Sequence, residues 1–231
     1  MLNEIGVETT FENNKITVTS SAVEMFQSKK VTIESDWSSA SYWYSIIALS
    51  GVGTQITLSS YKETSLQGDS ALVKIYKYFG VETVFNDNNS ITISKINNSQ
   101  FTIHNLQLNN SPDIAQTIAV TAFGLGMSCH LTGLHTLKIK ETDRLEALKV
   151  ELTKLGAIVS VTNDSLTLEL SIISRNKTIS IATYQDHRMA MAFAPLALKV
   201  PIIIEDSEIV SKSYPTFWDD LKGVGFEITE L

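Results

Sequence analysis

The chain has little of several residue types, and each shortage excludes a class of protein. Its 231 residues include a single cysteine, Cys129, which excludes an internal disulfide framework and indicates a reducing compartment. Only 4 prolines and 11 glycines occur, which excludes collagen-like and low-complexity chains. Lysine and arginine number 18 against 25 acidic residues, a formal net charge of −7 that argues against a general nucleic-acid binder.

The sequence also has no long uninterrupted hydrophobic run. Its most apolar stretch, residues 189–204, contains Lys199 and two prolines, whereas a membrane span needs about 18 or more apolar residues. The start of the chain has no basic segment followed by an apolar one, as a signal peptide would have. We therefore expect a globular, cytoplasmic protein that has neither a membrane nor a nucleic acid as its partner.

One segment recurs along the chain. Residues 5–20 (IGVETTFENNKITVTS) reappear as residues 79–94 (FGVETVFNDNNSITIS), and looser copies lie at 155–171 and 224–231. The glycines that anchor the copies are 74, 76 and 69 residues apart: Gly6, Gly80, Gly156 and Gly225. This spacing is longer than the 20–50 residues of solenoid repeats, so each repeat is expected to be a small subdomain.

Each repeat is predicted to have the element order β-α-β-α-β-β. β-Branched runs indicate strands, apolar residues at helical spacing indicate helices, and asparagine-rich turns indicate hairpins. The first unit is expected to contain a strand at 31–35, a helix at 39–49, a strand at 55–59, a helix at 68–80 and a hairpin at 81–94. The second is expected to contain a strand at 101–106, a helix at 113–126, a strand at 129–134, a helix at 141–156 and a hairpin at 157–170.

The third repeat is predicted to follow the same order but to end on one strand. Its elements are expected at 178–184 (strand), 186–198 (helix), 201–206 (strand), 214–225 (helix) and 226–231 (strand). Pro195 lies inside the first of these helices and should kink it.

The predicted fold class is α/β, built from α+β repeats in which three units surround buried parallel helices, with the sheets outside. Two predicted helices, at 114–125 and 189–198, are apolar on almost every face and must be buried. The chain begins inside a repeat, at its closing hairpin, which suggests a fragment of a longer protein. We expect residues 1–28 to be the tail of a preceding domain and residues 29–231 to form the next one. Its repeats are expected at about 29–95, 100–171 and 177–231.

Arginine is scarce, and two of the three arginines fall in the first turn of a predicted helix. Arg144 and Arg188 begin the helices at 141–156 and 186–198. A cation is unfavourable there because the N-terminus of a helix is already positive. A bound carboxylate or phosphate would remove the conflict by accepting from the backbone and the guanidinium together. The alternative is that each arginine reaches solvent or pairs with its neighbour, Asp143 or Asp186 respectively.

Further charged residues gather at the helix starts. The run KIKETDR places Lys138 and Lys140 on one face of a segment expected to be extended, beside Glu141. Carboxylates close to lysines can donate and accept protons, since neighbouring charges shift their pKa values. The alternative for this run is a solvated group of charges. Lys212 holds a comparable position before the last helix, and Asp113 lies in the first turn of another helix, where a simple partner of the helix dipole is the alternative. No spaced set of cysteine, histidine and carboxylate residues indicates a metal site.

Five motifs resemble the 5-enolpyruvylshikimate-3-phosphate synthase family, in that family's order and spacing. They are SDWSSASYW (35–43), SPDIAQT (111–117), KETDRLEAL (140–148), YQDHRMAMAF (184–193) and SKSYPTFW (211–218). The resemblance implies two domains, each of three β-α-β-α-β-β units, with the active site between them. This chain would supply the C-terminal domain, and the N-terminal domain would be its missing partner.

The resemblance also implies a reaction: transfer of the enolpyruvyl group of phosphoenolpyruvate to the 5-hydroxyl of shikimate 3-phosphate, by addition and elimination, with no metal or organic cofactor. By resemblance, Asp113 binds the shikimate hydroxyls and is a candidate base, and Lys140 contacts the 5-hydroxyl. Glu141 moves a proton at the methylene carbon, and Arg144 and Arg188 hold the phosphoenolpyruvate carboxylate.

Three further roles follow from the same resemblance. Lys212 would help to bind the phosphate of phosphoenolpyruvate and act in acid–base chemistry, and His187 would support the site. Thr136 stands where many members carry asparagine, so its contact with the substrate differs from theirs. Two alternatives stay open: the related UDP-N-acetylglucosamine enolpyruvyl transferase, which lacks the KETDR and DHRMAM motifs, and a non-catalytic anion-binding domain of the same fold. As a partial shikimate-pathway enzyme, the chain is expected to be inactive alone.

Overall fold

The computed structural model describes residues 2–19, 32–98, 103–174 and 178–230, and the chain divides into two units, 1–33 and 34–231. The first unit holds a short 3₁₀ helix, Asn3–Ile5, and an antiparallel hairpin of β1 (Thr9–Glu12) and β2 (Lys15–Val18). Both turn residues are asparagines at positive φ, a conformation that asparagine tolerates. The hairpin expected at the start of the chain is confirmed. The predicted domain boundaries at 28, 100 and 177 lie outside the described residues or directly beside them.

The second unit begins with one helix and a three-stranded antiparallel sheet in the order β3-β5-β4. The elements are α1 (Trp37–Leu49), β3 (Gln55–Ser59), α2 (Leu72–Ile75), β4 (Val81–Asn86) and β5 (Ser90–Lys95). The predicted helix at 68–80 is helical throughout but not regular, since α2 lies between two 3₁₀ turns, Gly68–Ala71 and Tyr76–Phe79.

Residues 103–168 form the predicted β-α-β-α-β-β unit in full. Its sheet has the order β6-β7-β9-β8, in which β6 and β7 are parallel and the final hairpin is antiparallel. The elements are β6 (Ile103–Gln107), the 3₁₀ turn η4 (Pro112–Ile114), α3 (Ala115–Gly124), β7 (Cys129–Thr132), the 3₁₀ helix η5 (His135–Ile139), α4 (Arg144–Lys154), β8 (Val159–Val161) and β9 (Ser165–Leu168).

The last repeat contains a two-stranded parallel sheet. Its elements are β10 (Ile179–Ile181), α5 (His187–Phe193), the 3₁₀ helix η6 (Ala194–Leu198), β11 (Ile202–Ile204), the 3₁₀ helix η7 (Ser207–Lys212) and α6 (Phe217–Gly223). The change from α5 to η6 occurs at Ala194, directly before Pro195, which confirms the expected break, because proline cannot donate the backbone hydrogen bond that continues an α-helix.

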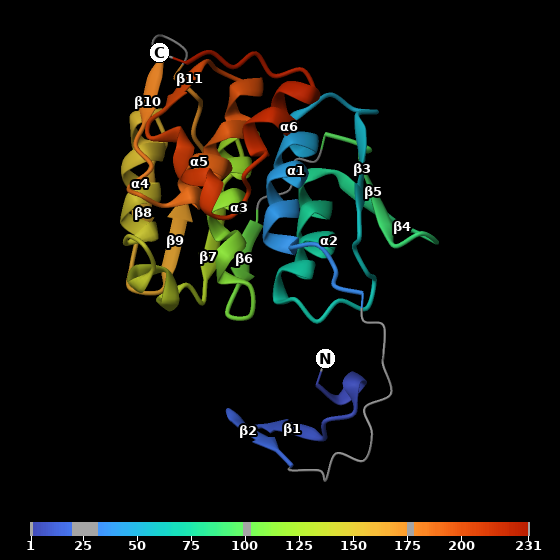
Figure 1. Ribbon diagram of the computed structural model, residues 1–231. Coiled ribbons are helices and arrows are strands. Elements are labelled where there is room, and N and C mark those ends of the chain that lie inside the picture. Colours follow the sequence, from blue (N-terminus) through green and yellow to red (C-terminus); the bar gives the residue numbers. More distant parts are fainter. Residues whose placement is uncertain (1, 20–31, 99–102, 175–177, 231) are drawn as a thin grey trace. The chain divides into compact units, whose positions relative to one another are not determined.

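Helices α1, α3 and α5 pack together inside the second unit, and the sheets lie around them (Figure 1). Ser41 and Ser45 of α1 hydrogen-bond Thr117 and Thr121 of α3, and equal steps in both helices mean that the two run in the same direction. Their C-terminal ends meet at Gly124, where an added Cβ would lie 2.6 Å from a methyl carbon of Leu49 and 2.8 Å from one of Leu196. Any side chain larger than that of glycine would therefore force these two buried leucine side chains to shift.

Two predicted strands are wrong. Residues 32–35 are not a strand, because their polar groups find other partners: the Ser35 carbonyl accepts from the Gln67 side chain, and the Ser35 hydroxyl donates to the Ser59 carbonyl. Residues 226–230 are not a strand either. The Phe226 N–H donates to the Leu221 carbonyl at the end of α6 instead of entering a ladder with β10 and β11.

The predicted start of α4 is also wrong by three residues. The helix begins at Arg144 instead of Glu141, because the Asp143 carboxylate accepts from the Glu146 N–H and so caps the helix at that point. Among the described residues, every helix is too short or too polar to cross a membrane.

Candidate functional site

The second unit brings together the starts of three helices. Asp113 lies in η4, directly before α3; Arg144 is the first residue of α4; and Arg188 is the second residue of α5. The caps fix these positions, since Asp186 accepts from the Arg188 N–H at 2.8 Å just as Asp143 caps α4. Residues from two repeats are thus placed within hydrogen-bonding distance of one another.

The carboxylate of Asp113 is the point where the cations converge. Its Oδ1 lies 3.0 Å from Nη1 of Arg144 and 3.3 Å from Nζ of Lys140, and its Oδ2 lies 3.3 Å from Nη2 of Arg188. Three cations around one carboxylate form an anion-binding arrangement, and in this chain the anion that they bind is Asp113 itself.

Arg144 is the most enclosed of these groups, with only 2% of its side chain exposed. Its Nε donates to the fully buried Asp186 at 2.6 Å, and its Nη2 donates to Glu141 at 2.6 Å. The guanidinium is therefore surrounded by three carboxylates, of Asp113, Glu141 and Asp186. The expected conflict between Arg144 and its helix terminus is resolved by protein carboxylates.

The neighbouring charges shift the pKa values of the two site acids in the same direction. Burial alone would raise the pKa of Asp113, but Arg188, Arg144 and Lys140 outweigh it and lower that pKa. Burial would likewise raise the pKa of Glu141, and its own backbone N–H together with Arg144 and His187 lowers it. Both acids are therefore held in the charged form, in which they accept hydrogen bonds.

Lys138 and Lys140 do not share a face, and this prediction is wrong. Lys138 lies in the 3₁₀ helix η5 and not in an extended segment, and its Nζ donates to Asn163 at 3.1 Å. Lys140 follows η5 and turns to Asp113. Only Lys140 joins the cluster.

The remaining predicted residues lie at its edge or apart from it. His187 has Nδ1 4.0 Å from Oε1 of Glu141, and its pKa is lowered by burial and by Arg188. The Thr136 hydroxyl is buried and has no hydrogen-bond partner among the described residues. Lys212 is the exposed last residue of η7, and its side chain pairs with no residue that the structure describes.

Asp186, His187 and Glu141 place ligand-type atoms within 4.8 Å of one another, which is close enough to surround a cation. The guanidinium of Arg144 already contacts the carboxylates of Asp186 and Glu141. A metal ion would have to displace or oppose that positive charge, so the donor set does not fit a metal.

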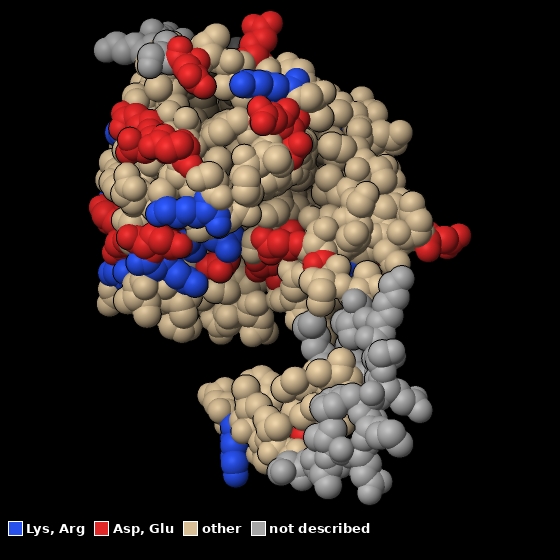
Figure 2. Space-filling model, in the orientation of Figure 1, with Lys and Arg blue, Asp and Glu red and all other residues tan. Residues whose placement is uncertain are grey.

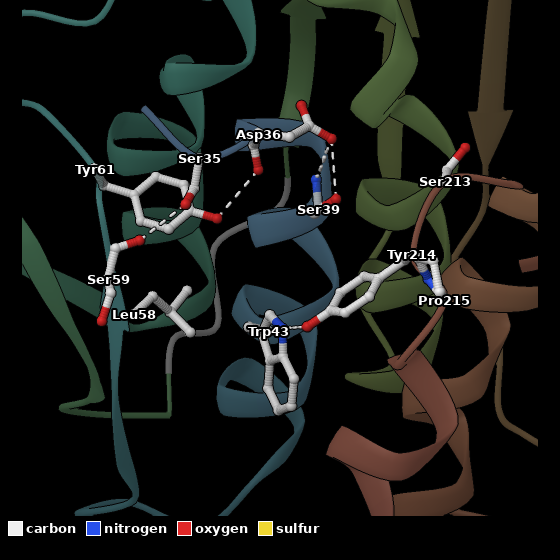
Figure 3. Close-up of a pocket in the computed structure, with 10 residues that line it drawn as sticks. All are labelled: Ser35, Asp36, Ser39, Trp43, Leu58, Ser59, Tyr61, Ser213, Tyr214 and Pro215. Carbon is white, nitrogen blue, oxygen red and sulfur yellow. Dashed lines mark hydrogen bonds between the residues drawn. The ribbon is translucent and has the colours of Figure 1, made fainter. Parts of the chain in front are cut away.

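A cavity of about 340 Å³ opens between the start of α1, strand β3 and the segment that follows η7. Its polar groups are largely paired with one another: Tyr61 donates to the Asp36 carbonyl, and Trp43 donates to the Tyr214 hydroxyl (Figure 3). None of the residues predicted for the site lines it. Acidic and basic side chains are interspersed on the face of the second unit in Figure 2, with no continuous basic surface there.

The sequence reasoning missed Asp186 as a partner of Arg144, and also the fully buried Glu151, which accepts from the Tyr184 hydroxyl at 2.6 Å. One signal could have found Glu151: it stands seven residues after Arg144, so both project from the same face of α4. Nothing in the sequence pairs Arg144 with Asp186, because they belong to different repeats.

The comparisons with known proteins agree with the motifs. The family model for EPSP synthase (3-phosphoshikimate 1-carboxyvinyltransferase) matches residues 1–221. A 3-phosphoshikimate 1-carboxyvinyltransferase of Bacteroides fragilis is 45% identical over 205 residues, 85% of this chain and 48% of that protein. One of Clostridioides difficile is 33% identical over 232 residues, 99% of this chain and 51% of that protein. The chain thus spans about half the length of the curated relatives it matches.

Two solved structures share the fold. EPSP synthase from Acinetobacter baumannii has a TM-score of 0.78 at 22% identity, covering 99% of this chain and 54% of that chain. The enolpyruvyl transferase NikO from Streptomyces tendae has a TM-score of 0.69 at 14% identity, covering 99% of this chain and 52% of that chain. The predicted enolpyruvyl transferase α/β fold is confirmed.

Proposed function

Because this chain belongs to the EPSP synthase family, we propose that it supplies one half of an enzyme of aromatic amino-acid biosynthesis. That enzyme transfers the enolpyruvyl group of phosphoenolpyruvate to the 5-hydroxyl of shikimate 3-phosphate, in the cytoplasm. The other half is an N-terminal domain that completes the substrate site, in keeping with the 48% of the Bacteroides fragilis relative that this chain matches.

The observation that carries the proposal is the convergence of Lys140, Arg144 and Arg188 on Asp113. Both substrates carry several negative charges, and a cluster of cations is what such substrates need. In our proposal, the carboxylate of phosphoenolpyruvate replaces that of Asp113 as the partner of Arg144 and Arg188. Lys140 then donates to the shikimate hydroxyl instead of to Asp113. Asp113 then loses the charges that lower its pKa and becomes a stronger base.

The proposed chemistry then follows in two steps. In the addition, Asp113 takes the proton of the 5-hydroxyl, the hydroxyl oxygen bonds to C2 of phosphoenolpyruvate, and Glu141 gives a proton to C3. In the elimination, Glu141 takes a proton back from C3, the C2–C3 double bond re-forms, and phosphate leaves with its electron pair. Glu141 needs a proton for the first step, and its pKa rises when Arg144 turns to the substrate.

The remaining residues have supporting roles in the proposal. Lys212 binds the phosphate of phosphoenolpyruvate and protonates it as it leaves. His187, which lies beside Glu141, holds that carboxyl in place. Thr136 lies in η5, the segment directly before Lys140, and its unpaired hydroxyl would hydrogen-bond the substrate after a local shift. No metal or organic cofactor takes part.

The two alternatives are less well supported. The family model and the relatives at 45% and 33% identity are named for the shikimate enzyme and not for a nucleotide-sugar enzyme. A non-catalytic anion-binding domain would need the arginines but would have no need of Glu141, which is present and hydrogen-bonded to Arg144.

A chimera tests the proposal. The N-terminal half of the Bacteroides fragilis relative is joined to this chain, and phosphate release from phosphoenolpyruvate is measured with shikimate 3-phosphate present. We expect release by the chimera and none by the 231-residue chain alone. A folded chimera without release would refute the proposed reaction, whereas release by the chain alone would refute the need for a second half.

A further inference from the structure

A strained turn precedes Asp186. Tyr184 and Gln185 both have positive φ values, 55° and 58°, and the Asp186 N–H donates to the Thr183 carbonyl at 2.9 Å. Two consecutive residues at positive φ are the mark of a type I′ turn, which glycine, asparagine and aspartate dominate. Tyrosine and glutamine are unfavourable there, so other interactions must hold the turn.

Glu151 provides the buried interactions, and the exposed side-chain amide of Gln185 adds a longer one by donating to the Asp206 carboxylate at 3.4 Å. Oε1 of Glu151 accepts from the Tyr184 hydroxyl at 2.6 Å, and its Oε2 accepts from the Ala182 N–H at 3.2 Å. The Glu151 carboxylate is fully buried, whereas Tyr184 is 37% exposed. The hydroxyl of Tyr184, more than burial of its ring, therefore fixes the turn to α4.

Helix α4 contacts the same segment at a second point. Arg144 lies seven residues before Glu151, two turns away on the same face of the helix. Its Nε donates to Asp186, at the far end of the turn. One face of α4 thus holds residues 182–186 on both sides of the strained pair, and Asp186 in turn caps α5 next to Arg188.

We infer that Tyr184 and Glu151 are positioning residues, whose hydrogen bond keeps the strained turn closed and thereby places Asp186 between Arg144 and the start of α5. Neither residue contacts the cations of the site directly. Their effect on substrate binding rests on the proposed function, but their effect on Arg144 does not.

The direct test follows the Arg144 Nε–H by NMR in the 231-residue chain. This proton is protected because it donates to a buried carboxylate at 2.6 Å. We expect Tyr184→Phe to speed its exchange with water by roughly tenfold, the effect of losing about one hydrogen bond from the turn. Tyr44→Phe is the matched control, since it removes a comparable hydroxyl bond, to Thr83 at 2.7 Å, and should leave Arg144 unchanged.

A second substitution distinguishes positioning from general loosening. Asparagine tolerates positive φ better than glutamine, so Gln185→Asn relieves the strain of the turn, although it shortens the side chain that donates to the exposed Asp206 at 3.4 Å. The double variant Tyr184→Phe with Gln185→Asn should restore slow exchange at Arg144. Glu151→Gln should speed exchange at least as much as Tyr184→Phe does, since it also removes the ion pair of Glu151 with Lys154 at 2.7 Å.

In the chimera, Tyr184→Phe should raise KM for phosphoenolpyruvate by about 5-fold and change kcat by less than about 2-fold, since the loss falls on binding. Unchanged Arg144 exchange in a folded Tyr184→Phe chain overturns the inference, whether or not the chimera is active. An inactive wild-type chimera with faster Arg144 exchange in the variant supports the inference and refutes only the proposed function. Variants that fail to fold, or exchange that Gln185→Asn does not restore, overturn the positioning role.

Discussion

Arg144 donates to Asp186, 42 residues further along the chain, at 2.6 Å, although Asp143 is its immediate neighbour. Asp143 instead uses its carboxylate to cap α4. The pairing joins the second repeat to the third at a position with almost no solvent exposure, where an unpaired charge is very costly. It therefore contributes to stability and at the same time orients the guanidinium towards Asp113.

Removing this arginine should destabilise the chain strongly. Arg144→Ala leaves the buried carboxylate of Asp186 without its cation, and breaking a buried pair in this way costs about 3–5 kcal/mol of unfolding free energy. Lys149→Ala is the control, because Lys149 forms an exposed ion pair with Glu146 on the same helix, worth less than about 1 kcal/mol. Urea denaturation of both variants measures the difference. Similar losses in the two would contradict the assigned importance of the buried pair.

In the chimera, the same cluster predicts a binding defect. Arg188 is partly exposed and contacts Asp113 without bridging buried carboxylates, so Arg188→Ala should leave the fold nearly intact. We expect it to raise KM for phosphoenolpyruvate by on the order of 10- to 100-fold, as expected for loss of a charge-assisted hydrogen bond to a carboxylate. An unchanged KM, measured by steady-state phosphate release, would remove the assignment of Arg188.

The stability of the chain should fall in acid, partly through Asp113. Its folded pKa lies below the ordinary value of 3.8, so its contribution is present above pH 3.8 and is lost as the pH falls through the lower folded pKa. Asp113→Asn should therefore reduce the loss of unfolding free energy between about pH 6 and pH 3. Urea midpoints measured across that range check this.

Asp69 provides a control, because its pKa is shifted in the opposite direction from that of Asp113. Burial raises its pKa, while a hydrogen bond from Ser38 lowers it in part, so its contribution is present below pH 3.8 and is lost as the pH rises through the folded pKa. Asp69→Asn should therefore steepen the acid loss. If both variants changed the slope in the same direction, the assigned shifts would be wrong.

Lys95 should make stability rise at alkaline pH. It is 2% exposed, its Nζ donates to the Phe79 carbonyl at 2.6 Å, and burial, with a smaller effect from Lys199, lowers its pKa from 10.5 to about 8. The folded chain therefore loses the Lys95 proton near pH 8, whereas the unfolded chain keeps it until about pH 10.5. The free energy of unfolding should rise between these two values, by up to about 3 kcal/mol. Lys95→Met should flatten that rise in urea midpoints. A wild-type profile already flat would contradict the shifted pKa.

An extra methyl group at Gly124, where α3 meets α1 and η6, should destabilise the chain modestly. Gly124→Ala places a Cβ within 2.8 Å of Leu49 and Leu196, and the strain should outweigh the better helix propensity of alanine by about 1 kcal/mol. Gly223, the last residue of α6, has nothing within 4 Å of an added Cβ, so Gly223→Ala should be neutral or slightly stabilising. The midpoints of thermal unfolding of the two variants test this. A Gly124→Ala chain more stable than the wild type would show that Leu49 and Leu196 leave room for the added methyl group.

Much of the fold could be predicted from local signals. The recurring hairpins have alternating β-branched residues around asparagine turns, and the residues at helical spacing around Leu72, Ile75 and Tyr76 are buried as expected. The two failed strands, 31–35 and 226–231, have strand composition, but ladder formation depends on a neighbouring strand. Composition cannot show whether that neighbour is present. In the structure, the Ser35 carbonyl accepts from the Gln67 side chain, and the Phe226 N–H donates to the Leu221 carbonyl.

Local charge patterns indicate part of the candidate site but not its pairings. The helix potential singles out Arg144 and Arg188, the charge run at 138–144 adds Lys140 and Glu141, and these side chains meet at Asp113 or at Arg144, whereas Lys212 lies apart. That their common anion is a carboxylate of the protein, and that Lys138 turns away to Asn163, depended on contacts between distant segments.

The recurring hairpins and the charged residues near the helix starts can be recognised from the sequence, because these features depend on residues a few positions apart. The meeting of the starts of α3, α4 and α5, the pairing of Asp186 with Arg144 and the hold of Glu151 on the strained turn arise from the packing of segments far apart in the chain. Such contacts join residues 31 to 75 positions apart, and their energy depends on burial, which no local pattern records.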